Sequence, residues 1–180
     1  KRMGNVIDYW VQYGDQAFAE RAFCDVDVLI LAQLSYFDFG SAVPTIAQHK
    51  KSVTLEEIDR TADLSAVFAD KWYGENNRKL WNALLAGRRF RTMRCNYYRE
   101  RMEEEQEAQF GAVTFFPEGC EPVVAFRGTD DSVVGWKEDF RLAFRKSLAS
   151  QEMSSVYLNQ VGCKLPGAFM VCGHSKGGNL

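Results

Sequence analysis

The sequence closes with Val171-Cys172-Gly173-His174-Ser175-Lys176-Gly177-Gly178-Asn179-Leu180, which contains a Gly-x-Ser-x-Gly pattern. The pattern follows an uncharged run at 168–172, and such a run is typical of a fully buried parallel strand. The glycines permit a sharp turn and a helix that begins after Ser175 and passes close to the strand. A strand-turn-helix of this kind exposes a serine hydroxyl and aims backbone N–H groups at a reacting carbonyl. We therefore interpret Ser175 as a candidate nucleophile rather than as part of an ordinary glycine-rich turn.

The overall composition is that of a globular chain with one substantial core. Hydrophobic residues make up 46% of the 180 residues, and 22 basic side chains nearly balance 24 acidic ones. This balance gives no general attraction to nucleic acid. The chain has two histidines, His49 and His174, so a histidine-based metal site is not expected, and we expect no cofactor.

The cysteines indicate the compartment. Their number, five, is odd, and no Cys-x-x-Cys spacing occurs. This pattern argues against a disulfide framework or a zinc cluster and favours a reducing compartment. The first residues lead into no signal-type apolar segment, and apolar runs such as 28–32 are far too short to span a membrane. We therefore expect a cytoplasmic protein without a transmembrane segment.

Residues 1–107 are predicted to form a mainly helical N-terminal region. Periodicity and capping signals predict helices at 6–17, at 26–36, after the capping-box spacing Thr54-Leu55-Glu56-Glu57, and at 76–86. Residues 88–107 place six arginines before an acidic run. A nucleic-acid surface is one interpretation of these arginines. Adjacent blocks of opposite charge favour a solvated, self-paired surface instead.

Residues 108–180 carry a different pattern, which predicts an α/β arrangement. The runs 110–116 and 123–126 are typical of strands, and the turn between them predicts a hairpin. Val133, Trp136, Phe140 and Phe144 recur at helical spacing, and a further helix is expected over 153–161 before the final strand.

An attack by Ser175 requires two donors for the oxyanion. The backbone N–H of Lys176, which directly follows the serine, would be the first. Thr129 lies in the loop after the strand 123–126 and offers an N–H and a hydroxyl as the second. Its spacing alone leaves this interpretation open beside that of a plain helix-entry residue.

Three separate stretches of the sequence carry a family resemblance. The stretches 123–129 (Val-Val-Ala-Phe-Arg-Gly-Thr), 135–140 (Gly-Trp-Lys-Glu-Asp-Phe) and 173–178 resemble the class 3 lipases and the lipase-like α/β-hydrolases of unknown function in bacteria. The resemblance is clear over 108–180, and the stretch 34–39 extends it over most of the chain. It implies an α/β-hydrolase fold, present as its N-terminal portion through the nucleophile elbow, with the C-terminal part missing.

The resemblance also implies roles for individual residues. Ser175 corresponds to the nucleophile, and Thr129 and Lys176 correspond to the oxyanion hole. The segment 130–136 lies where lipases carry a lid, so contact with an acyl chain is one interpretation of its apolar residues, Val133, Val134 and Trp136. The buried face of a helix is the favoured interpretation, because Phe140 and Phe144 continue the same stripe.

The resulting hypothesis is a serine hydrolase of esterase or lipase type that acts on a small-molecule acyl ester or lipid-like substrate. The acid and histidine of the triad are expected after residue 180, so we expect Ser175 to be nearly idle in this piece. His174 is expected to pack or make a structural hydrogen bond, and recruiting His49 would require an unusual topology. Lys176 replaces an apolar residue of the lipases, and its ammonium suggests a polar or anionic ester.

The alternative is a non-catalytic α/β-hydrolase-like scaffold that binds an acyl ligand or a protein partner. A phosphate-binding module is disfavoured, because Gly-x-x-x-x-Gly-Lys-[Ser/Thr] is absent. The sequence predicts neither the oligomeric state nor the acyl length of a substrate.

Overall fold

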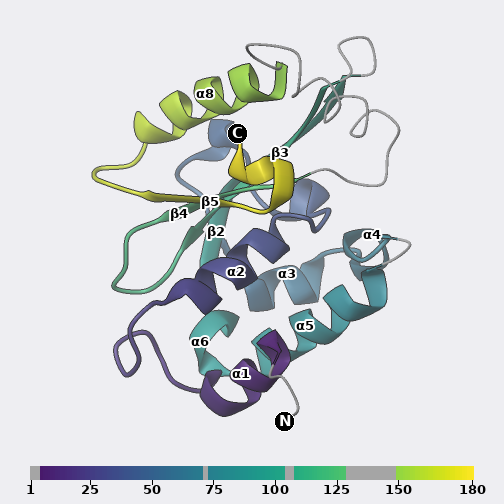
Figure 1. The fold of residues 1–180 in the computed structure, drawn as a ribbon, viewed down its shortest axis with the longest axis vertical. Helices are drawn as coiled ribbons and strands as arrows, with labels where there is room; N and C mark the ends of the chain where they lie inside the picture. Colours follow the sequence, from purple (N-terminus) through teal and green to yellow (C-terminus); the bar gives the residue numbers. More distant parts are fainter. Residues whose placement is uncertain (1–4, 71–72, 104–107, 129–148) are drawn as a thin grey trace.

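The structure is a computed structural model that describes residues 5–70, 73–103, 108–128 and 149–180. Helices and strands are mixed along the chain (Figure 1). In chain order the elements are α1 (Val6–Tyr13), α2 (Asp25–Leu34), η1 (Gly40–Ala42), η2 (Ile46–Gln48), β1 (Val53–Thr54), α3 (Leu55–Thr61), α4 (Leu64–Val67), α5 (Gly74–Ala86), α6 (Arg88–Arg91), β2 (Arg94–Glu103), β3 (Ala108–Phe116), β4 (Val123–Phe126), α8 (Ala149–Gly162), β5 (Met170–Gly173) and η3 (Ser175–Gly178).

The strands of the described residues form one mixed sheet in the order β1-β2-β3-β4-β5. Strands β1 to β4 pair antiparallel, and the predicted hairpin is confirmed by the pairing of Ala112 with Phe126 in β3 and β4. Strand β5 runs parallel to β4, with Val123 opposite Met170. The chain therefore has the α/β class that the sequence predicted.

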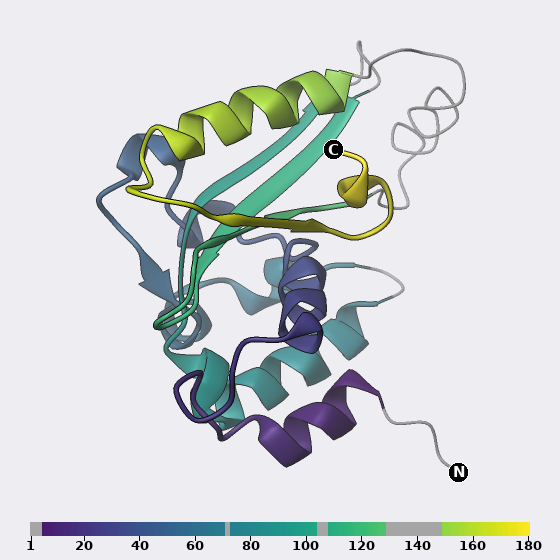
Figure 2. The same cartoon turned by 60° about the vertical axis from the view of Figure 1, so that its left-hand side comes forward.

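Helices cover both faces of this sheet. The helices α1 to α6 lie on one side and α8 lies on the other (Figures 1 and 2). The larger core packs Leu34, Trp81 and Phe90 of the first layer against Val113 and Ala125 of the sheet. It therefore joins residues from both of the predicted regions, 1–107 and 108–180.

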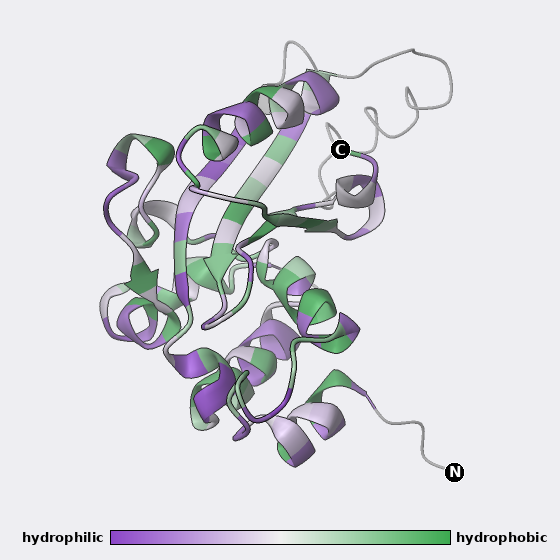
Figure 3. Ribbon diagram, turned by 90° about the vertical axis from the view of Figure 1, so that its left-hand side faces the viewer, coloured by the Kyte–Doolittle hydropathy of each residue, from purple (hydrophilic) through white to green (hydrophobic). Residues whose placement is uncertain are grey.

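A smaller core lies under α8. Tyr157 and Val161 of this helix pack on Phe110 and Phe126 of the sheet, and all four are fully buried. Figure 3 shows hydrophilic and hydrophobic residues mixed along α8, whereas β4 and β5 are mainly hydrophobic. The helix predicted over 153–161 is confirmed, and it begins four residues earlier at Ala149.

Local signals explain the helix ends that the sequence predicted. The Thr54 side chain accepts a hydrogen bond from the Glu57 N–H, and the Glu57 carboxylate accepts one from the Thr54 N–H, which completes the capping box of α3. Helix α5 ends before Gly87, as predicted. A β-carbon at Gly87 would collide with the carbonyl of Gly14, so the glycine lets this corner pack closely.

Strand β2 was not predicted from the sequence. Its register shifts between Asn96 and Arg99, and Cys95, Asn96, Tyr97 and Tyr98 are buried in succession. This β-bulge interrupts the alternation of buried and exposed residues that would have indicated a strand. The charged segment 88–107 is therefore, in its described part, a short helix followed by a sheet strand.

The final strand was predicted to be fully buried, and this prediction is wrong. Strand β5 is the last strand of the described sheet, and Val171 is 52% exposed. Its parallel pairing with β4 is confirmed. The helix predicted through Val133, Trp136, Phe140 and Phe144 lies outside the described residues.

Candidate functional site

The Gly-x-Ser-x-Gly pattern forms a turn between β5 and η3, and we call residues 173–178 the Ser175 turn. Ser175 is exposed and is the first residue of η3, with a φ of 56°. For a residue with a β-carbon, this left-handed conformation costs about 1–2 kcal/mol. The turn therefore holds Ser175 in a strained backbone conformation with its side chain at the surface.

The glycines on either side of Ser175 are required by close packing. A β-carbon at Gly173 would collide with the carbonyl oxygen of Gly177. One at Gly177 would collide with the carbonyl oxygen of Phe126 at the end of β4. The spacing of the pattern thus follows from a tight turn that lies directly on the neighbouring strand.

The loop after β4 reaches the same place. A β-carbon at Gly128 would collide with the Tyr36 hydroxyl and with the His174 carbonyl oxygen, and it would lie 3.1 Å from Ser175 Cβ. The loop that leads to Thr129 therefore starts in contact with the Ser175 turn. Thr129 itself, the predicted second oxyanion residue, lies outside the described residues. So do Val133, Val134 and Trp136 and the predicted lid segment 130–136.

His174 is held by Tyr36, a residue from the loop after α2. The Tyr36 hydroxyl lies 3.0 Å from His174 Nδ1 and 3.5 Å from the His174 carbonyl oxygen. The two rings meet edge to face, with centroids 5.8 Å apart. The structural hydrogen bond predicted for His174 is confirmed. His49 uses its carbonyl to accept a bond from Asn96, and no hydrogen bond among the described residues joins it to Ser175.

Sequence reasoning did not identify Tyr36 as a site residue. The two partners are 138 residues apart, so no local pattern connects them. The stretch 34–39, which contains Tyr36, was the available signal. It indicated a family resemblance and gave no role to Tyr36 itself.

Lys176 follows Ser175 but does not expose its charge. Its side chain is buried, and the ammonium donates to the carbonyl of Gln109 on β3 over 3.3 Å. The ammonium thus points into the protein, away from the surface where Ser175 lies. The backbone N–H of Lys176 remains the candidate oxyanion donor, because it directly follows the serine in the first turn of η3.

The buried side chain of Arg127 anchors the start of the loop after β4 to the neighbouring strands β2 and β3. Arg127 Nη1 lies 2.6 Å from Glu100 Oε1, and the Tyr98 hydroxyl donates to Glu100 Oε2 over 2.7 Å. Burial, together with the Glu100 carboxylate, raises the pKa of Tyr98, so its hydroxyl keeps its proton. The Arg127 side chain also lies over Gly111, where a β-carbon would be 2.9 Å from Nε. These contacts fix the residue that precedes Gly128.

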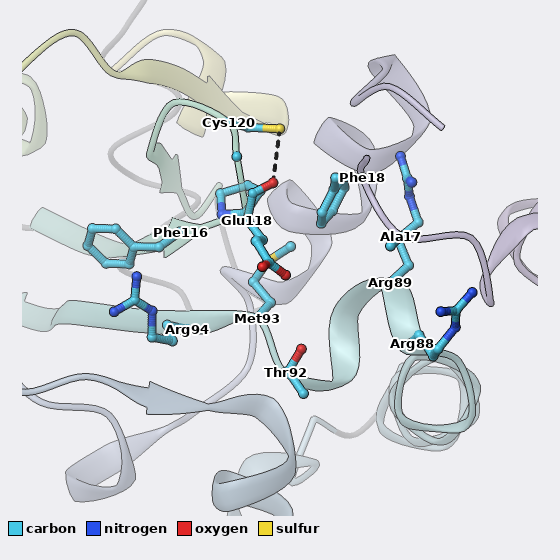
Figure 4. A pocket seen from close by; sticks show the side chains of 12 residues that line it. Ala17, Phe18, Arg88, Arg89, Thr92, Met93, Arg94, Phe116, Glu118 and Cys120 are labelled. Carbon is cyan, nitrogen blue, oxygen red and sulfur yellow. Dashed lines mark hydrogen bonds between the residues drawn. The ribbon is translucent and has the colours of Figure 1, made fainter. Parts of the chain in front are cut away.

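The cavity in Figure 4, of about 510 Å³, lies elsewhere. It opens where β3 ends and the turn to β4 begins, whereas the Ser175 turn packs on the other end of β4. Cys120 lines it and donates to the carbonyl of Glu118 over 3.7 Å. The lining residues are Ala17, Phe18, Arg88, Arg89, Thr92, Met93, Arg94, Phe116, Pro117, Glu118, Gly119 and Cys120. None of them belongs to the Ser175 turn.

The described part of the chain contains neither a metal-binding cluster nor a membrane-spanning helix. No group of three or more His, Cys, Asp or Glu side chains gathers there in a way that would hold a metal ion. No helix in these segments is both long and apolar enough to cross a bilayer.

A model of the Mbeg1-like family matches residues 84–180, which is just over half of the chain and includes β2 to β5 and the Ser175 turn. The chain belongs to the Mbeg1-like family. Comparisons with curated proteins and with solved structures gave no match.

This match corrects the family predicted from the sequence. The assignment to the class 3 lipases and the lipase-like α/β-hydrolases is wrong, because the family that matches is Mbeg1-like. The family therefore gives no support to a hydrolase or lipase activity or to a nucleophilic serine, since the Mbeg1-like match supplies none of these properties. Short motifs are weak evidence for membership of a family, because a strand-turn-helix with glycines reflects backbone packing as well as ancestry. Any role for Ser175 in this Mbeg1-like protein must rest on its own geometry.

Proposed function

We propose that Ser175 is the nucleophile of acyl-ester hydrolysis. The observation that carries this proposal is the backbone of Ser175, a non-glycine residue at a φ of 56° whose side chain is nevertheless exposed. Strain of this kind collects at functional sites, where the surrounding structure maintains it. Here the contacts at Gly173, Gly177 and Gly128 maintain it.

The proposed reaction assigns a task to each part of the turn. Ser175 Oγ attacks the ester carbonyl and loses its proton to a base, while the N–H of Lys176 stabilises the oxyanion. Collapse of this intermediate releases the alcohol, and water then releases the acid from Ser175. Among the described residues no hydrogen bond joins the His174 ring to the Ser175 hydroxyl, so we do not assign His174 as the base. The general base is the part of this mechanism that the described residues do not supply.

We also propose that the sheet is part of an α/β-hydrolase fold. The parallel pair β4 and β5 ends in two loops that meet at Gly128 and Ser175. An α/β-hydrolase fold places its reactive serine after a parallel strand in this way, with a loop from an earlier strand beside it. We propose this arrangement for the sheet on geometric grounds, independently of the family assignment.

We also propose a class of substrate and a cellular compartment. A small-molecule acyl ester or lipid-like substrate fits the proposed chemistry. A cytoplasmic location is supported by the five cysteines, all of which are free thiols.

Labelling with a fluorophosphonate tests the proposed function. The full-length protein and its Ser175→Ala and Ser155→Ala variants are incubated with the probe. Ser155 is a matched control, because it is an exposed serine on α8. We expect labelling that Ser175→Ala abolishes and Ser155→Ala retains. Absence of Ser175-dependent labelling in folded protein would contradict the proposal and would favour a non-catalytic scaffold that binds an acyl ligand or a protein.

A further inference from the structure

Tyr36 places its hydroxyl between the two loops that form the candidate site. It lies against Gly128 of the loop after β4, and it contacts both the ring and the carbonyl of His174. His174 directly precedes Ser175. A single phenolic oxygen therefore touches both sides of the candidate site.

The base of this side chain is firmly anchored. Leu34 and Phe37, on either side of Tyr36 in the chain, are fully buried in the larger core. The Phe37 ring also packs edge to face on Phe68, with centroids 5.3 Å apart. The Tyr36 hydroxyl is thus presented from a rigid part of the N-terminal layer.

The hydrogen bonds of Tyr36 act on the residue that sets the turn. The His174 carbonyl also accepts from the Gly177 N–H over 3.0 Å, and this bond closes the start of η3. When His174 Nδ1 carries the proton, it donates to the Tyr36 oxygen, and the phenol O–H is then directed to the His174 carbonyl. Both contacts resist rotation of the peptide that leads into Ser175.

We propose that Tyr36 is a positioning residue for Ser175, whose hydroxyl fixes His174 and thereby the orientation of the serine. This inference rests on the proposed function of Ser175. It also assigns a task to the N-terminal layer, which holds the site from a distance of 138 residues in sequence.

The test is the rate of fluorophosphonate labelling in Tyr36→Phe, which keeps the ring and removes the hydroxyl. We expect the maximal labelling rate constant at Ser175 to fall about tenfold, because small errors in the placement of a nucleophile are costly. The probe concentration at half-maximal rate should change little, since Tyr36 acts through His174.

Tyr157→Phe is the matched control. The Tyr157 hydroxyl donates to the Tyr97 carbonyl over 2.6 Å, under α8 on the other face of the sheet. Its loss should lower the midpoint of unfolding and leave the labelling rate constant unchanged, which separates positioning from stability.

Two outcomes would overturn the inference in distinguishable ways. Equal rate constants for the wild type and Tyr36→Phe would overturn the role of Tyr36 while the proposed function stands. Absence of Ser175 labelling in the wild type would overturn the proposed function and this inference with it.

Discussion

Tyr97 and Ser175 share one backbone conformation in very different surroundings. Their φ angles are 58° and 56°, and among the described residues they are the non-glycine positions with positive φ. Tyr97 lies in the bulge of β2, and Ser175 lies in the turn after β5. The two regions show how the same strain can have two origins.

The strain at Tyr97 is offset by its own contacts. Its side chain is buried, its ring meets Phe116 edge to face at 6.0 Å, and its carbonyl accepts the Tyr157 hydroxyl. Its N–H donates to the Asn96 side chain over 2.5 Å. Packing and hydrogen bonds therefore account for this conformation without any functional role.

The strain at Ser175 has no such local compensation. The side chain is exposed, and no hydrogen bond of its hydroxyl occurs within the described residues. The turn is maintained instead by its neighbours, through the close approaches at Gly173 and Gly177 and the bonds of His174. This contrast separates Ser175 from Tyr97 and supports the role that we propose for Ser175.

Tyr97→Gly should have the largest effect on stability. Glycine relieves the strain but removes a buried aromatic ring, so we expect a net loss of about 2–4 kcal/mol in the free energy of unfolding. Urea unfolding of the variant and the wild type measures this loss. An unchanged midpoint would mean that packing does not maintain the bulge.

Gly177→Ala should destabilise the protein by about 2 kcal/mol, because the added β-carbon collides with the Phe126 carbonyl. Gly167→Ala is the control, since a β-carbon there meets nothing within 4 Å. Thermal unfolding of both variants tests the close contact between η3 and β4. Similar midpoints for the two would contradict it.

Tyr157→Phe should cost about 1.5 kcal/mol, because it leaves the buried Tyr97 carbonyl without its donor. Denaturant unfolding measures this cost. A neutral result would show that this bond does not support the bulge conformation of Tyr97.

Ser175→Gly should have the smallest effect and the opposite sign. We expect a gain of about 1 kcal/mol in stability, because glycine adopts this φ without steric cost. Ser175→Ala keeps the β-carbon and should give no such gain. A loss of stability in Ser175→Gly would show that the serine side chain itself supports the turn, and the contrast with Tyr97 would then fail.

Local signals made much of the fold predictable. The Thr54 and Glu57 capping box, the glycine stop at Gly87 and the hairpin through 110–116 and 123–126 all act within a few residues. Each depends on residue types or on a spacing of side chains that can be read directly in the sequence. The class of the fold follows from these elements.

The rest depended on contacts that no local pattern encodes. The bulge at Tyr97 interrupts the alternation of buried and exposed residues that would have indicated β2. The exposure of Val171 depends on the place of β5 in the sheet. In the candidate site, the sequence predicted roles for Ser175 and Lys176 and an ammonium beside the substrate, whereas the Lys176 ammonium points to Gln109. The contact between Tyr36 and His174 required the tertiary structure.

The most direct test of the central claim is to map a fluorophosphonate adduct on the full-length protein by mass spectrometry. If the strained turn presents a nucleophile, one adduct per chain should form, and fragmentation should place it on Ser175. Folded protein that gains no adduct, or an adduct on a different serine, would contradict the account.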